Sequence, residues 1–170
     1  MTPSSFPRGS SHLAQKPISV RLKGGGSLEG LIHIPDGLSL LHFMGTKKKF
    51  LNLTSVRPSD VSRGQDPIGH LSLRLTNIVW IVPLDGTLHI STASITADAK
   101  RSVEIELVDG IKLQVDLHIA EEQRMSDYLD GDWSFLPLWS ALDLETSQIF
   151  ERIAVNHDTI LSIREIVDLD

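Results

Sequence analysis

The chain has 170 residues, 41% of them hydrophobic and 22% charged, so its composition is that of an ordinary globular protein. It contains no cysteine, which excludes disulfides and thiolate metal sites. Its longest apolar run, residues 77–84, is far shorter than the roughly 20 residues of a membrane-spanning helix.

Charge is distributed unevenly. Residues 1–85 hold ten Lys/Arg and five Asp/Glu, a balance of +5, whereas residues 86–170 hold six and seventeen, a balance of −11. The two balances add to the net charge of −6. Opposite charges favour oriented packing, either of one part on the other or head to tail between chains.

The first part of the chain predicts short strands. Residues 1–16 are rich in Ser and Pro and lack the apolar segment of a signal peptide, so we expect a flexible arm on a cytoplasmic protein. Residues 17–84 then form a predicted first domain. Its expected elements are a hairpin (18–22 and 28–34) around the glycine turn 24–26, a helical turn (38–44), and strands at 50–56, 71–75 and 78–84.

The second part repeats this pattern. Residues 85–101 are expected to be a linker, in which residues 88–92 could add an edge strand. Residues 102–170 form the predicted second domain, whose hairpin turns at Asp109-Gly110. Its further expected elements are a helical turn at 124–129 and strands at 135–142, 149–155 and 159–166.

The two domains also match residue by residue at an offset of 85. The matched positions are mostly apolar and alternate, which is typical of a conserved core pattern rather than of a repeated catalytic site. The matches include Leu22/Leu107, Gly25/Gly110, Leu28/Leu113, His33/His118, Phe50/Phe135, Leu51/Leu136 and Leu53/Leu138. A long period indicates two copies of a small domain. Domains of roughly 65 residues are marginal alone, so we expect the copies to pack on each other or on a partner.

The order of strands and glycine turns resembles the Sm-like class of SH3-type barrels. The resemblance rests on residues 20–25 with 28–31, and on residues 153–156 with Ile160 and Ile163. The second copy is also similar to an uncharacterised bacterial repeat, through residues 124–127 (Arg-Met-Ser-Asp) and 135–138 (Phe-Leu-Pro-Leu). The resemblance implies an all-β protein of two tandem, five-stranded, strongly bent barrels with little helix. Sm-like RNA binders share an Arg-Gly or Lys-Gly pair before the last strand, and residues 74–76 and 154–156 contain no glycine.

Candidate chemical groups do not combine into a reactive set. His33 and His118 occupy equivalent strand positions without a second ligand two residues away, which favours exposed histidines over a metal site. Asp127, Asp130 and Asp132 alternate as in a calcium loop but lack its closing glutamate. No serine has a partner histidine that the pattern can place. We therefore predict a protein that is not an enzyme and uses no metal or cofactor.

Aromatic residues give the best candidates for a binding surface. In residues 133–142, Leu136 and Leu138 are expected to face the core, which turns their neighbours to the outer face. An aromatic face bounded by acidic residues is typical of a protein contact site. It could equally close the interface between the copies. The candidate protein-binding residues are Trp133, Phe135, Trp139 and, in the first copy, Trp80.

The basic first copy adds a second surface, because Lys47, Lys48 and Lys49 could contact nucleic acid or an acidic partner. A pI near 5.6 and few neighbouring aromatics argue against nucleic acid. We therefore predict a non-catalytic protein-binding or scaffolding subunit, in a homo-oligomer or a larger complex. One alternative is an Sm-like RNA-binding module using the basic copy. Another is an accessory subunit docked on the cytoplasmic face of a membrane complex.

Overall fold

The computed structural model describes residues 12–60, 66–91 and 99–167, and in these the protein is all-β, as expected. The first half contains β1 (Leu13–Leu22), β2 (Ser27–Pro35), α1 (Leu40–Gly45), β3 (Phe50–Pro58), β4 (Ile68–Arg74), the 3-10 turn η1 (Leu75–Asn77) and β5 (Ile78–Pro83). The second half contains β6 (Ala99–Leu107), η2 (Val108–Gly110), β7 (Lys112–Ile119), α2 (Met125–Leu129), β8 (Phe135–Asp143), β9 (Ile149–Asn156), η3 (His157–Thr159) and β10 (Ile160–Glu165).

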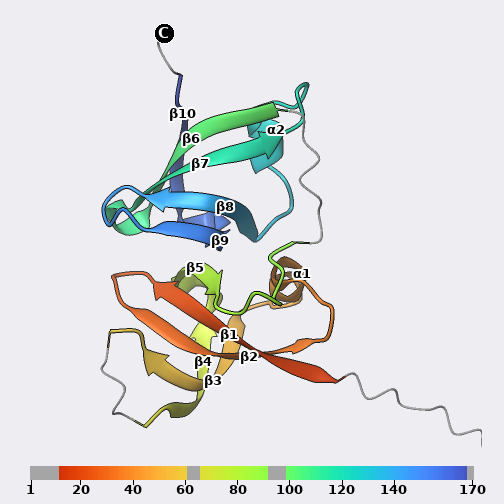
Figure 1. Ribbon diagram of the computed structural model, residues 1–170, viewed down its shortest axis with the longest axis vertical. Helices are drawn as coiled ribbons and strands as arrows, with labels where there is room; N and C mark the ends of the chain where they lie inside the picture. The colour runs from red at the N-terminus through yellow and green to blue at the C-terminus, as the bar shows by residue number, and fades with distance from the viewer. Residues whose placement is uncertain (1–11, 61–65, 92–98, 168–170) are drawn as a thin grey trace, which may run out of the picture.

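The ten strands form one antiparallel sheet in the order β10-β6-β7-β8-β9-β5-β1-β2-β3-β4. Each half has the same internal order, with its last strand beside its first. The halves stack along the long axis of the molecule and meet where β5 pairs with β9 (Figure 1). Pairing among the described residues leaves this sheet open, so the prediction of two tandem five-stranded barrels is not confirmed.

Each half nevertheless has its own hydrophobic core. Alternating residues of β1, β2 and β3 fill the first, and the equivalent residues of β6, β7 and β8 fill the second, as the sequence pattern predicted. Fully buried examples are Ile18, Val20, Ile32 and Leu53 in the first core and Val103, Ile105, Leu113 and Leu138 in the second.

The third strand of each half bends at the same place. Ser55 in β3 and Ser140 in β8 both have a positive φ, of 51° and 53°. In each strand the registered pairing with the next strand skips this residue. Such an irregularity bends a strand and increases its twist, which lets each half of the sheet curve around its core.

Several expected boundaries are wrong, and one of them is the end of the linker, because β6 begins at Ala99 and residues 99–101 therefore belong to the sheet. β1 begins at Leu13, so residues 13–16 belong to the sheet rather than to a flexible arm, and residues 1–11 lie outside the described residues. In the linker, residues 88–91 form no strand. The carbonyls of His89 and Ile90 accept hydrogen bonds from the first amides of α1, and this contact replaces strand pairing. Residues 92–98 lie outside the described part.

Candidate functional site

Two of the four predicted contact aromatics are buried between the halves. Trp80, in β5, is 7% exposed and packs on Phe150 in the second core, with ring centroids 5.2 Å apart. Phe135, in β8, is 2% exposed and belongs to the first core. The alternation was predicted correctly, since Leu136 and Leu138 do face the core of their own half. Phe135 does not lie on an open face, because the first half covers it, so for this residue the alternative reading, closure of the interface between the copies, is the correct one.

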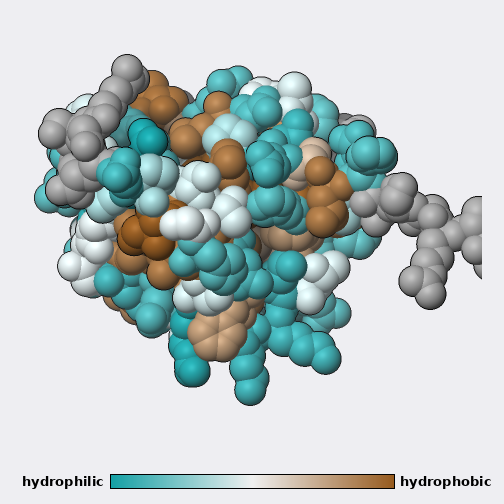
Figure 2. All heavy atoms as spheres, turned by 90° about the horizontal axis from the view of Figure 1, so that it is seen from below, coloured by the Kyte–Doolittle hydropathy of each residue, from teal (hydrophilic) through white to brown (hydrophobic). Residues whose placement is uncertain are grey.

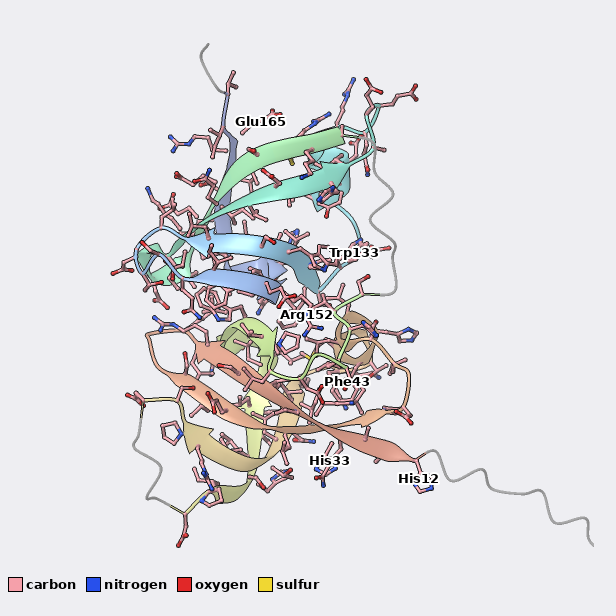
Figure 3. All side chains as sticks on the ribbon, viewed as in Figure 1. His12, His33, Phe43, Trp133, Arg152 and Glu165 are labelled. Atoms are coloured by element: carbon pink, nitrogen blue, oxygen red, sulfur yellow. The ribbon has the colours of Figure 1, made fainter. Side chains whose placement is uncertain are left out.

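Polar groups also hold the halves together. Nδ2 of the buried Asn156 donates to the carbonyl oxygens of Ile78 and Leu75 at 2.8 and 3.1 Å. The Arg152 guanidinium, near the seam in Figure 3, donates to carbonyl oxygens of the linker, at 2.6 Å to Leu88 and 3.2 Å to Asp85. These bonds join side chains of the second half to backbone carbonyls of the first half and of the linker, which favours one fixed arrangement of the halves.

Trp133 is the predicted aromatic that remains open to solvent. It is 44% exposed and lies in the segment before β8, at the level of the seam and on the side of α1 (Figure 3). Its indole lies against the backbone of Gly131, where an added Cβ would stand 2.6 Å from Cδ1 of the ring. Its own amide donates to the carbonyl of Gly131 at 2.7 Å. The ring is thus held on a glycine that no larger residue can replace without moving it.

Residues from both halves line a hollow on one side of this indole, called here the lysine-side hollow. The first half contributes Lys47 and Lys48, and the second contributes Asp132, Trp133 and the turn 156–158. The Lys47 ammonium lies 4.3 Å from the centre of the Phe43 ring, a cation–π contact that positions it. Lys48 is exposed. Two lysines and an indole therefore face one concave surface.

The rim of this hollow is formed by the turn η3. Nε2 of His157 lies 2.8 Å from the carbonyl oxygen of Leu129, and because a carbonyl can only accept, that nitrogen donates. The backbone amide of His157 donates to the carbonyl of Ser134. His157 thus fixes α2 and the start of β8 relative to each other and is a structural group of the rim.

Trp133 also lines a second hollow, called here the α1-side hollow. It is lined by Leu41, His42 and Met44 of α1 and by residues 132–135. α1 is held there by its N-cap, since Ser39 Oγ accepts from the amide of His42 at 3.3 Å. The two hollows share residues 132–135, so they adjoin along this segment and Trp133 lines both of them.

Trp139 lies elsewhere, on the outer side of the second half. It is partly buried and lines a third hollow between β7 and β8 together with Lys100, Asp116 and His118. Lys49, the last of the predicted basic residues, is exposed and is not among the residues that line these hollows. The structure therefore joins Trp133 with Lys47 and Lys48, and separates Trp139 from them.

The predicted histidines are half-buried. His33 Nε2 lies 3.0 Å from Thr54 Oγ1, and its equivalent His118 lies beside Trp139 in the third hollow. Within the described residues, no three His, Asp or Glu side chains are grouped so that they could hold a metal ion. The helices in the described ranges are too short or too polar to cross a membrane.

Comparison with known proteins gives no match, either to a family model, to a curated protein or to a solved structure.

Sequence reasoning missed three residues that shape the site. Gly131 supports the indole, Asn156 ties the halves together and His157 orders the rim. Asn156 and His157 were recognisable as turn residues, but nothing in the local pattern indicated that this turn would meet the first half. Gly131 carried no signal beyond its place in an acidic loop.

Proposed function

We propose that the protein is a non-catalytic binding subunit that holds a protein partner at the junction of its halves, with Trp133 as the main contact. The underlying architecture is proposed to be a duplicated Sm-like/SH3-like small β fold. The observation that supports the proposal is that Trp133 is an exposed indole and lines two adjoining hollows, to each of which both halves contribute residues.

Physical considerations favour this residue. A tryptophan supplies a large contact area with only two rotatable bonds, and its ring is already positioned by Gly131, so binding costs little conformational entropy. The surrounding groups are polar and of both charges, including Lys47, Lys48, Asp132 and Asp158. An aromatic centre with a polar rim is the usual anatomy of a protein interface. Trp139 is proposed as a separate, lesser contact.

The test is the affinity of the native partner, isolated by co-purification and identified by mass spectrometry. We expect Trp133→Ala to weaken binding by about 2 kcal/mol, roughly 30-fold, in isothermal titration calorimetry. Gly131→Ala keeps the indole but displaces it, and is expected to give a smaller loss. Ile149→Ala, at another exposed apolar residue, is the control and should bind as the wild type does. An unchanged affinity for a folded Trp133→Ala variant would reject Trp133 as the contact.

The affinity of the Trp139→Ala variant for the same partner is measured in the same way. If the outer face of the second half takes part, binding weakens in this variant as well, and the loss adds to that of Trp133→Ala because the residues line different hollows. A partner that belongs to a membrane complex would place the protein on that complex. The identity of the partner therefore distinguishes an accessory subunit of a membrane complex from a free scaffold.

A second candidate is single-stranded RNA, because Lys47 and Lys48 share the lysine-side hollow with the Trp133 indole. Cationic groups beside an aromatic platform are what single strands need for backbone contact and base stacking. Fluorescence anisotropy with a labelled RNA oligomer at low salt is the measurement. Each of Lys47→Gln and Lys48→Gln should reduce the salt dependence by about 0.7 in slope. No binding at low salt removes this candidate.

A further inference from the structure

The third hollow lies where the pairing of β7 with β8 stops, at Gln114. The amide of Leu144 donates to the carbonyl of Lys112 at 3.0 Å, so the polar backbone groups of Lys112 face β8. Because the direction of these groups alternates along a strand, those of Asp116 and His118 face the same side. In the part of the chain that the structure describes, β8 pairs with neither of them. The hollow therefore borders a short row of backbone donors and acceptors that strand pairing does not use.

The residues around this hollow combine one large aromatic ring with polar groups. Trp139 is the aromatic residue of the lining, and Val115 and Leu142 are its aliphatic residues. The polar residues of the lining are Lys100, Gln114, Asp116, His118 and Ser140. By contrast, the end of the molecule formed by the first half shows apolar patches spread among hydrophilic side chains (Figure 2). A concave surface with an apolar part and a few convergent polar groups is what small-molecule sites have in common.

The charges of the lining favour a neutral ligand that both donates and accepts hydrogen bonds. Lys100 disfavours a cation and Asp116 disfavours an anion, since like charges at close range are costly. Oδ1 of Asp116 accepts from Ser102 Oγ at 2.5 Å, which holds the carboxylate in place, and Oδ2 remains able to accept from a ligand. The Lys100 ammonium can only donate, whereas the ring of His118, opposite Lys100 in the register, can do either. The lining thus offers donors and acceptors from neighbouring strands.

We propose that the third hollow binds a saccharide, with one face of a pyranose ring on the Trp139 indole. A pyranose is neutral, and its ring face carries C–H groups whose small positive charges suit the electron-rich face of an indole. Its edge carries hydroxyls, each of which can donate and accept, as the polar residues of the lining and the open backbone groups of β7 require. A saccharide here would cover the lesser protein contact proposed at Trp139. The contact proposed at Trp133 lies in other hollows and does not depend on it.

The first half does not repeat this site. At the offset of 85, the equivalent of Trp139 is Thr54, whose Oγ1 lies 3.0 Å from Nε2 of His33. The equivalent of Asp116 is Leu31, which is paired with Thr54, so β2 and β3 stay together where β7 and β8 part. The chain is therefore expected to bind one saccharide, although its fold is duplicated.

The test follows the indole N–H signals of the full chain by proton–nitrogen correlation NMR. The chain has three tryptophans, and the spectrum of a Trp139→Phe variant identifies the signal of Trp139. The probes are the methyl glycosides of glucose, galactose, mannose and N-acetylglucosamine, each added to about 50 mM because a small neutral ligand is expected to bind with a Kd of about 1 mM. We expect at least one glycoside to shift the Trp139 signal along a single-site curve and to leave the signal of Trp133 in place.

Variants then assign the contact. For the glycoside that binds, Trp139→Ala should weaken the affinity at least about tenfold, and Trp139→Phe, which retains an aromatic face, should weaken it less. Asp116→Ala should weaken it at least about fivefold, and because Asp116 is exposed, this variant should fold as the wild type does. Trp133→Ala, which removes an exposed indole from the other two hollows, is the control and should bind the glycoside like the wild type.

Three results would overturn the proposal. The first is a Trp139 signal that none of the glycosides shifts. The second is a glycoside affinity that Asp116→Ala leaves unchanged or that Trp133→Ala abolishes, because the sugar then lies elsewhere. The third is a shift caused by free alanine and by none of the glycosides, which would assign the hollow to a zwitterion that pairs with both Lys100 and Asp116.

Discussion

The second and third strands of the two halves differ in how far they stay paired. In the first half, the pairing of β2 with β3 runs on to Leu31, opposite Thr54. In the second half, the pairing of β7 with β8 ends at Gln114, opposite Leu142. The strands part there, and the hollow lined by Trp139 lies between them.

The residue at one position of the second strand accounts for this difference in pairing. At Gly30, an added Cβ would stand 3.3 Å from three atoms of β3, belonging to Leu53, Thr54 and Val56, so the close approach of the strands requires glycine. The equivalent residue of the second half is Val115, which is 3% exposed. Its side chain occupies the space through which β3 approaches β2 in the first half. In the second half, which has this side chain, the pairing of β7 with β8 is therefore shorter, and a hollow lies between the two strands.

The largest expected effect comes from breaking the close approach. Gly30→Val should lower the free energy of unfolding by about 2 kcal/mol, because the new side chain meets backbone and buried atoms that cannot all move aside. Urea denaturation measures the change. Gly69→Val, at a strand glycine with no atom near its Cβ position, is the matched control and should be neutral or slightly stabilising. Equal losses in both variants would contradict the explanation.

A smaller effect is expected from making the second half resemble the first. Trp139→Thr introduces the residue type of Thr54, the equivalent position in the first half. It should lower the free energy of unfolding by about 1 kcal/mol. The loss is limited because the indole is only partly buried and lines an open hollow, so its removal leaves little closed cavity. Trp139→Phe, which retains an aromatic ring, should cost less than half as much. Thermal and urea unfolding of both variants give the comparison.

The smallest expected effect concerns an aromatic residue that differs between the two short helices, α1 and α2. Phe43 of α1 is buried, and its equivalent in α2 is Tyr128, the only tyrosine of the chain. Burial raises the pKa of the Tyr128 hydroxyl above its ordinary value of about 10. Absorbance near 295 nm therefore reports this group alone. Native protein should titrate at higher pH than protein unfolded in urea, and coincident curves would show that α2 does not shield the ring.

The sign of the corresponding stability change follows from linkage. The contribution of the neutral hydroxyl is fully present below the unfolded pKa, near 10, and is lost as the pH rises through the higher folded pKa. Tyr128→Phe removes this dependence. In that variant, the fall in stability between neutral and strongly alkaline pH should be smaller than in the wild type.

Sequence reasoning located the strands because most of them follow a period-two pattern with turn residues at their ends, and β5 is a short apolar run between such residues. The glycines at 24–26 all have positive φ, and Asp109 and Gly110 do as well, as the predicted hairpin turns require. These are local signals. The linker prediction failed for a physical reason, because alternation at Leu88 and Ile90 shows only that both side chains are buried. Whether they are buried by strand pairing or against a helix depends on the tertiary contact.

The sequence indicated which residues belong to the candidate site, but it did not indicate that they lie together. Trp133 stood out as an aromatic in an acidic loop, and Lys47 and Lys48 as a basic run. They meet only because β5 pairs with β9, and no local pattern specifies which edge of one half joins which edge of the other. The same pairing decides that Phe135 is covered and Trp133 is not.

The exchange of aromatics across the seam has a consequence for folding. Phe135 completes the core of the first half and Trp80 that of the second, so each half on its own would lack part of its interior. Heating should therefore melt the two halves together, and scanning calorimetry should record one heat-absorption peak. A gene divided within the linker would yield two fragments that are poorly folded apart and regain structure when combined, whereas two separate peaks would mean that each interior is self-sufficient.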